Sequence, residues 1–160
     1  MTSDLFNEGL TEMYQGEMLG VAIFDRMLPF FDDPVEHYKV ATMLQLETET
    51  VARLRPTMLA LGLDLAEKGD PGSLGQRVAD NLKGLKWDEL MLQLRDLVKP
   101  YVERYSEIVK IAPEKYRSIA ESMVVHEESL YRFAELELIG DSEHSLDDVI
   151  AQLHHPLPRP

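Results

Sequence analysis

The stretch from Asp33 to Gly62, DPVEHYKVATMLQLETETVARLRPTMLALG, decides the fold. Its apolar residues recur at spacings of three and four, which is the period of one face of an α-helix. Asp33 is a typical N-cap, Pro34 suits the first helical position, and Glu36 completes the pattern of a capping box. Gly62 is the residue type that most often follows the last helical turn. The stretch therefore predicts a helix over residues 34–61.

Three further stretches carry the same period, and almost nothing alternates with the period of a strand. They predict helices over residues 3–29, 87–111 and 113–139. Only a few residues join the first helix to the second and the third to the fourth, which implies antiparallel neighbours. The connection over residues 62–86 is long enough to run back along a helix, even with a helical turn at 74–82. We therefore expect an all-α fold, an antiparallel four-helix bundle of two hairpins joined by one long crossover; a simple up-down-up-down bundle is the alternative.

A short tail follows the expected bundle of residues 1–140. Residues 141–160 predict a short helix with Ser145 as its N-cap and two aspartates in its first turn. The end of the chain, HPLPRP from His155, is too rich in proline for helix or central strand. We expect this tail to pack on the bundle or to trail from it.

Composition and charge narrow the classes of function. The chain has 160 residues, 44% of them hydrophobic, which suits one compact domain with a sizeable core. It has no cysteine, which excludes disulfides, thiolate nucleophiles and zinc–thiolate sites. Its 29 acidic and 16 basic residues give a net charge of −13, which argues against nucleic acid and anionic membranes as partners. Without a signal-peptide pattern or an apolar run of about 18 residues, the sequence predicts a soluble cytoplasmic protein.

Three polar residues interrupt the apolar stripes. Glu17, Glu47 and His126 fall within the apolar arcs of their helices, and each lies near its helix midpoint. The midpoints of equal antiparallel helices meet at one level, so we expect these side chains to converge. Two buried carboxylates repel unless they share a proton or a cation. The three residues together predict a metal site in the core, whereas any one of them alone would more simply lie at the rim or pair with Arg or Tyr.

This pattern resembles the ferritin-like superfamily of di-metal carboxylate proteins, and the resemblance covers the four expected helices. The usual ligand set there is one Glu from each of two helices and a Glu-x-x-His pair from each of the other two. Glu17, Glu47 and His126 match three of these positions. Thr50 stands where the second helix would carry His, and Met123 stands where the fourth would carry Glu. The resemblance therefore implies a single metal ion more readily than a di-iron centre, with iron first and manganese or zinc as alternatives.

Weaker ligand candidates lie beside these three. Tyr101 and Tyr105 fall on the apolar arc of the third helix, where they can bind, support the ligands or simply fill the core. Glu103 falls outside that arc, but a π-bulge at Pro100 would bring it closer to the core. Thr50 is a further weak candidate.

Other residues around the expected site allow two interpretations each. Gly16 and Gly20 flank Glu17, and they indicate either close packing of a neighbouring helix or space for a ligand. Tyr14 is a third tyrosine that could line the same chamber or, more simply, fill the core with its hydroxyl hydrogen-bonded. Glu127 and Glu49 are expected at the solvated surface.

For function, the resemblance implies a metal-binding protein, and more specifically an iron- or manganese-dependent oxidoreductase that uses oxygen on an unidentified small-molecule substrate. The alternative is a non-catalytic bundle in which a Glu–His hydrogen-bonded network remains and the chain acts as a structural or interaction module. Leu19, Leu59, Leu92 and Tyr131 fall off the main arcs and indicate a second apolar face, and hence a homodimer.

Overall fold

The computed structural model describes residues 2–160, apart from the side chains of Thr2 and Pro71, and this part of the chain is helical and without strands. The expected all-α fold is confirmed. The helices, with two short 3₁₀ turns, are α1 (Thr2–Met27), η1 (Leu28–Phe30), α2 (Pro34–Ala60), α3 (Pro71–Leu82), α4 (Trp87–Ile111), η2 (Glu114–Tyr116), α5 (Arg117–Leu138) and α6 (Asp147–Ile150).

Local signals set the ends of α2. The side chain of Asp33 accepts hydrogen bonds from two amides of the first turn, at 2.9 and 3.0 Å, as an N-cap does. At the other end Gly62 has a φ of +68°, which glycine adopts without steric cost. Across it the amide of Leu63 donates to the carbonyl of Met58 at 2.9 Å. These bonds stop the helix where the sequence indicates.

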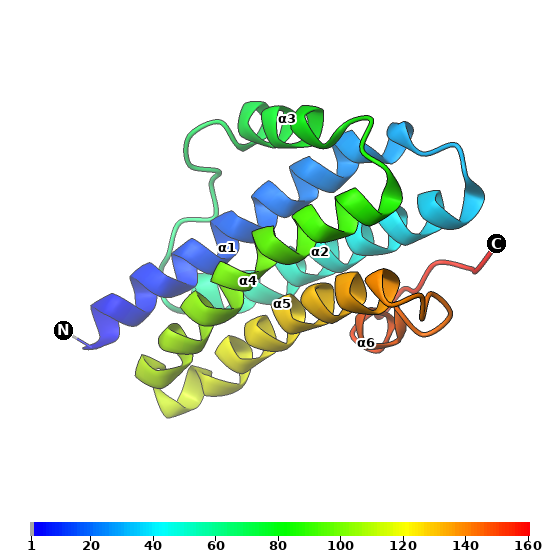
Figure 1. Ribbon diagram of the computed structural model, residues 1–160. Helices are drawn as coiled ribbons and strands as arrows, with labels where there is room; N and C mark the ends of the chain where they lie inside the picture. Colours follow the sequence, from blue (N-terminus) through cyan, green and yellow to red (C-terminus); the bar gives the residue numbers. More distant parts are fainter. Residues whose placement is uncertain (1) are drawn as a thin grey trace.

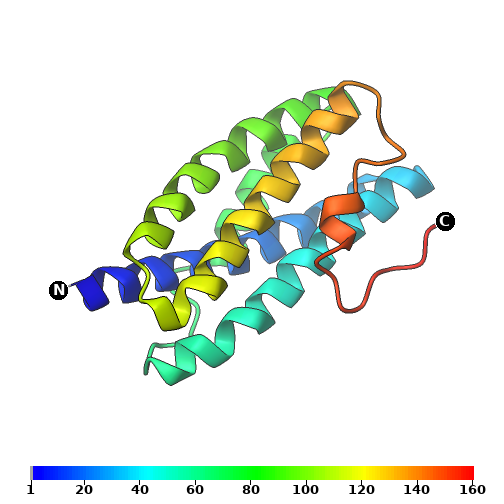
Figure 2. The same cartoon turned by 90° about the horizontal axis from the view of Figure 1, so that it is seen from below.

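The four long helices lie alongside one another (Figures 1 and 2). Consecutive helices α1 and α2 run in opposite directions, and so do α4 and α5, while the chain between α2 and α4 returns along the length of the molecule (Figure 1). This connection carries α3, which packs on α1 and is longer than the helical turn expected there. Gln15 of α1 holds the connection through hydrogen bonds with Ala66 (3.0 Å) and Lys68 (2.9 Å).

Tyr14 also belongs to this connection and not to the expected chamber. Its hydroxyl donates to the carbonyl oxygen of Leu65 at 3.2 Å and accepts from Arg55 Nε at 3.4 Å. Of the two roles expected for Tyr14, it fills the core with its hydroxyl hydrogen-bonded, and it does not line a chamber beside Glu17.

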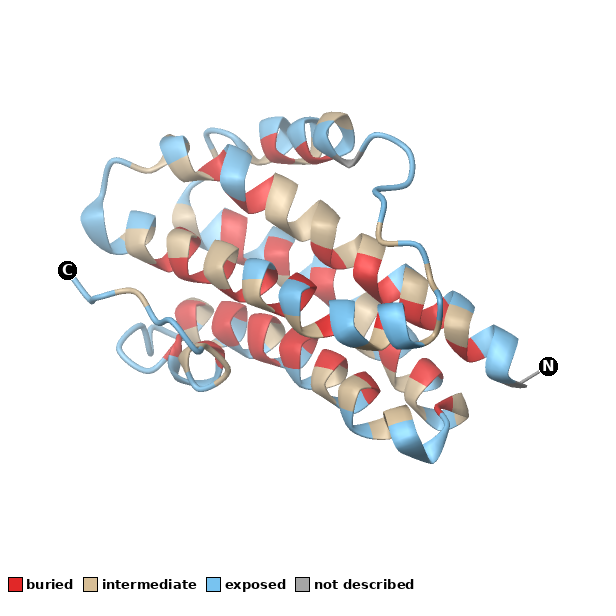
Figure 3. Cartoon of the chain, turned by 180° about the vertical axis from the view of Figure 1, so that it is seen from behind, coloured by how far each residue is buried: buried red, intermediate tan, exposed pale blue. Residues whose placement is uncertain are grey.

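The apolar core has two parts. Buried residues colour the inward faces of the long helices (Figure 3). One cluster joins the second half of α1 to the first halves of α2 and α4 and to α5, and the other joins their opposite ends. Between the two clusters the long helices bury polar side chains: Glu17, Glu47, Thr50, His126 and Glu127.

A second buried polar group ties α2, α4 and α5 together near the start of the tail. Lys39 pairs with Glu137, whose other oxygen accepts from Trp87 Nε1 at 2.7 Å. These bonds hold the pKa of Glu137 below its ordinary value against the opposing effect of burial. Ser145 is not the N-cap of α6, which begins at Asp147 without a side-chain cap, because its buried hydroxyl donates to the carbonyl oxygen of Ser142 at 3.0 Å.

Glu49 holds the tail on α2. Its carboxylate accepts hydrogen bonds from the amides of His154 (2.6 Å) and His155 (2.9 Å). Partial burial alone would raise the pKa of Glu49, but these hydrogen bonds outweigh it and lower the pKa to about 2. The side chain is only 13% exposed, so the expectation of a fully solvated Glu49 is wrong. The expectation failed because the residues that cover it are about a hundred positions away.

The outer surface carries some apolar residues. Of those expected to form a second apolar face, Leu59 and Leu92 are exposed, whereas Leu19 and Tyr131 are partly buried against the core. The homodimer stays a prediction. None of the helices in residues 2–160 is both long and apolar enough to cross a membrane.

Candidate metal centre

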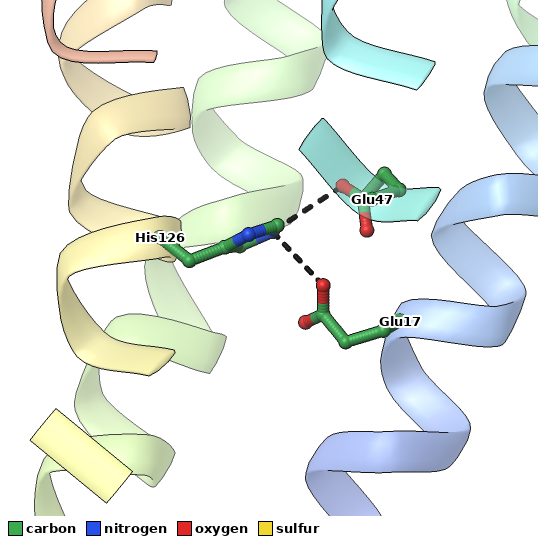
Figure 4. Close-up of side chains that lie close together, drawn as sticks. All are labelled: Glu17, Glu47 and His126. Atoms are coloured by element: carbon green, nitrogen blue, oxygen red, sulfur yellow. Dashed lines mark ion pairs between the residues drawn. The ribbon is translucent and has the colours of Figure 1, made fainter. Parts of the chain in front are cut away.

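Glu17, Glu47 and His126 meet in the middle of the molecule, one from each of α1, α2 and α5 (Figure 4). The imidazole Nε2 lies 3.1 Å from Glu17 Oε2 and 3.4 Å from Glu47 Oε1. One potential ligand atom from each residue lies within 4.8 Å of the other two. All three side chains are buried. The convergence expected from the helix midpoints is therefore present.

The spacing of these atoms suits a metal ion. Two atoms that each bind one metal at about 2.1 Å lie about 3.0 Å apart for a right angle and about 3.4 Å apart for a tetrahedral angle. The two separations from Nε2 fall in this range. Imidazole and carboxylate together suit iron, manganese and zinc.

Two of the converging atoms lack hydrogen bonds. Glu17 Oε2 and His126 Nε2 are both fully buried, and neither has a hydrogen-bond partner among residues 2–160, although they lie close together. Their approach thus has the distance of a polar contact without the alignment of a hydrogen bond. Buried polar atoms that are left unpaired are costly and rare in native proteins. The residues present therefore fit a cation that would accept both lone pairs.

Thr50 positions the imidazole. Its Oγ1 lies 3.0 Å from His126 Nδ1 and also accepts a hydrogen bond from Arg53 Nη2 at 3.2 Å. When the ring is neutral and Nδ1–H donates to this hydroxyl, the lone pair on Nε2 faces the two carboxylates. Thr50 is thus placed to support the ligand and not to be one, which corrects its place among the weaker ligand candidates.

Burial dominates the electrostatics of the two carboxyls. It raises the pKa of Glu17 well above the ordinary value; nearby His126 counteracts this rise and the Glu47 carboxyl adds to it. Burial raises the pKa of Glu47 to about 8. Without a cation the pair therefore retains at least one proton at neutral pH, and a cation would take that proton's place.

Gly16 and Gly20 provide room for the site. A Cβ on Gly20 would overlap the Glu47 carboxylate, and one on Gly16 would lie 2.6 Å from the Tyr105 hydroxyl. The space beside Glu17 is therefore occupied by polar side chains of α2 and α4 and not by the backbone of a neighbouring helix. This explains two glycines inside a helix, where each costs about 1 kcal/mol relative to alanine.

The remaining ligand candidates lie on α4 and do not join the three residues. Glu103 is exposed, and α4 is α-helical from Trp87 to Ile111, so Pro100 produces no π-bulge that would turn Glu103 inward. Tyr105 is buried and Tyr101 is half-buried, with their rings 5.9 Å apart. Among the described residues neither tyrosine hydroxyl makes a hydrogen bond to the three converging side chains. Burial raises the pKa of both tyrosines, which keeps them neutral.

Glu127 was expected at the surface but is 94% buried, with 6% of it exposed. Burial raises its pKa well above the ordinary value, and nearby His126 partly counteracts this rise. It borders a cavity of about 270 Å³ between α1, α3 and α4. Glu47, Tyr101 and Tyr105 are the other acidic and tyrosine side chains on that wall. The only sequence signal for Glu127 was its place next to His126, at the edge of the apolar arc.

Comparison of the chain with protein-family models, with curated proteins and with solved structures finds no match in any of the three.

Proposed function

We propose that this chain is a metal-binding protein of the ferritin-like type, with one divalent metal ion held by Glu17, Glu47 and His126 in the middle of the bundle. The observation that carries the proposal is the meeting of the buried, unpaired atoms Glu17 Oε2 and His126 Nε2 beside Glu47 Oε1. Two carboxylates balance the charge of a divalent cation, and the imidazole adds a neutral donor.

The helix arrangement supports the ferritin-like part of the proposal. Two helical hairpins joined by a connection that runs the length of the molecule are the arrangement of that class of bundle. The crossover carries α3 along α1 and returns the chain to the start of α4. In such bundles the metal site lies at mid-height on facing helices, which is the level of the three residues.

Iron is the first choice of metal, with manganese and zinc as alternatives, because the donor set is two oxygens and one nitrogen with no sulfur. A bound iron or manganese ion would supply oxygen-dependent oxidation chemistry. The protein would contribute in two ways. The two apolar clusters would keep water away from the site, and Thr50 would orient the imidazole. The apolar cavity on the Glu47 side gives a small molecule a place to bind.

Metal uptake tests the proposal. Untagged protein is loaded separately with Fe²⁺, Mn²⁺ and Zn²⁺, desalted, and analysed by plasma mass spectrometry. We expect close to one equivalent of metal in the wild type and almost none in Glu47→Gln, which keeps the shape of the side chain but not its charge. Glu8→Gln on the exposed side of α1 is the matched control and should retain the metal.

Absence of metal uptake would refute the proposed centre. If the wild type takes up no metal under any loading, the three residues form a hydrogen-bonded polar layer that shares a proton. Glu47 can hold that proton at neutral pH because its pKa is about 8. The chain would then be a non-catalytic bundle. Equal uptake by the wild type and Glu47→Gln would place the metal elsewhere and also refute the proposed centre.

A further inference from the structure

The cavity beside the centre has a mostly apolar wall, on which the Glu127 carboxyl makes no hydrogen bond. Its volume of about 270 Å³ is close to the lower end of small-molecule pockets. Aliphatic side chains of α1, α3 and α4 form most of the wall. Glu127 of α5 also borders it, is 94% buried, and makes no hydrogen bond or ion pair with any residue among 2–160. Its carboxyl oxygens are not among the fully buried atoms, so they reach the cavity and can meet a ligand group there.

The charge around the cavity selects the kind of ligand. No Lys, Arg or His lines it, whereas Glu47 and Glu127 both do. An anionic head group would meet two carboxyls and no counter-charge, and a wholly apolar ligand would leave Glu127 unpaired. A ligand with a cationic hydrogen-bond donor would pair with the Glu127 carboxyl. Glu47 Oε1 faces the imidazole at the centre, 3.4 Å from His126 Nε2, so Glu127 is the carboxyl left for a ligand in the cavity.

We propose that this cavity binds a small aliphatic primary amine, with the ammonium group on the Glu127 carboxylate and the alkyl chain among the side chains of α1, α3 and α4. The aliphatic wall selects the chain, since Leu, Val, Ile and Met predominate there. The head group forms a charge-assisted hydrogen bond in a mostly apolar site.

We infer that the cavity opens between α3 and α4, because the exposed residues of its lining, Leu74 and Leu97, lie on these two helices. Helix α3 packs closely on α1, where a Cβ on Gly75 would lie 2.7 Å from the Cβ of Ala22. Its contact with α4 is much less extensive. Leu74 of α3 and Leu97 of α4 both line the cavity and remain 40% and 43% exposed. A ligand can therefore enter past these two leucines.

This inference rests on the proposed function in one respect: a bound amine would be a substrate only if the proposed metal centre is present. Binding of the amine depends on Glu127 and on the apolar wall, and neither is among the three metal-binding residues. The two proposals can therefore fail separately.

Calorimetric titration of metal-free and of zinc-loaded protein tests the head group. The probes are n-hexylamine, hexan-1-ol and hexanoate, which share a chain and differ in charge. We expect hexylamine to bind the wild type at least about 10-fold more tightly than the other two, the order of one charge-assisted hydrogen bond. Glu127→Gln should remove this preference, and Glu128→Gln, the exposed neighbour on α5, should keep it.

A second pair of variants tests the cavity without touching a buried residue. Leu97→Trp should weaken hexylamine binding about 10-fold or more by filling the entrance, whereas Leu92→Trp should not. These two leucines of α4 are 43% and 42% exposed, and only Leu97 lines the cavity.

Three results would overturn the amine site: no saturable binding of hexylamine, hexanoate binding as tightly as the amine, or Glu127→Gln and Leu97→Trp both behaving like the wild type. Metal uptake with no amine binding would remove this inference and leave the metal centre standing. If the protein binds the amine but takes up no metal, the metal centre is refuted and the amine site stands.

Discussion

Replacing Glu47 by glutamine should change how the stability of the metal-free protein depends on pH. Burial raises the pKa of Glu47 from 4.5 to about 8 in the folded chain. A carboxyl with a raised folded pKa binds its proton more tightly in the folded than in the unfolded state. Its contribution to stability is therefore complete below pH 4.5 and is lost as the pH rises through about 8.

The size of the effect follows from these two values. At about 1.4 kcal/mol for each tenfold change in proton affinity, the whole contribution is about 5 kcal/mol, and about 3 kcal/mol of it is lost between about pH 5.5 and pH 8. The raised pKa of Glu17 adds a loss in the same direction. Glu47→Gln cannot ionise, so its free energy of unfolding should fall by about 3 kcal/mol less than that of the wild type over this range.

Urea unfolding followed by circular dichroism at the two pH values measures this difference. Glu8→Gln, an exposed carboxyl on α1, should behave like the wild type. A cation takes the place of the proton, so a metal concentration about 100 times the Kd should restore about 3 kcal/mol at pH 8 in the wild type. An equal fall with pH in the wild type and in Glu47→Gln would refute the reasoning, because Glu47 would then not be a buried, proton-binding carboxyl.

Three further changes have expected outcomes. Gly20→Ala places a Cβ in the Glu47 carboxylate, and urea unfolding should show a loss of about 1–3 kcal/mol together with weaker metal uptake. Thr50→Val removes the hydrogen bond to the imidazole, so metal affinity should fall about 10- to 100-fold in competition with a chelating dye; unchanged affinity would remove Thr50 from the site. Lys39→Met leaves the buried carboxylate of Glu137 without its cation and should cost about 3–5 kcal/mol in urea unfolding; a loss below about 1 kcal/mol would mean that water replaces the lysine.

Much of the helix layout could be predicted because it depends on neighbours in the chain. Asp33 caps α2 and Gly62 ends it through bonds that reach only a few residues. The expected helix over 87–111 has the bounds of α4. Helical period also placed Glu17, Glu47 and His126 inward, since each stands between apolar residues one turn before and after it.

The rest of the site could not be read from period alone. Glu127 is next to His126 on α5, and burying it requires a neighbouring helix to cover that flank. Thr50 could not be told from a ligand, because its role depends on the position of the imidazole of another helix. Glu103 stayed outside because α4 remains α-helical past Pro100, which the sequence leaves undecided.

By itself, then, the sequence determined what short-range physics controls: where the helices begin and end, which face of each is apolar, and that three polar residues interrupt those faces. Only the tertiary structure decided which flanks are covered and which polar atoms are left unpaired. It also decided that α3 packs along α1 and borders a cavity beside Glu127. These features depend on the rotation and spacing of helices distant in the chain, and no local propensity specifies them.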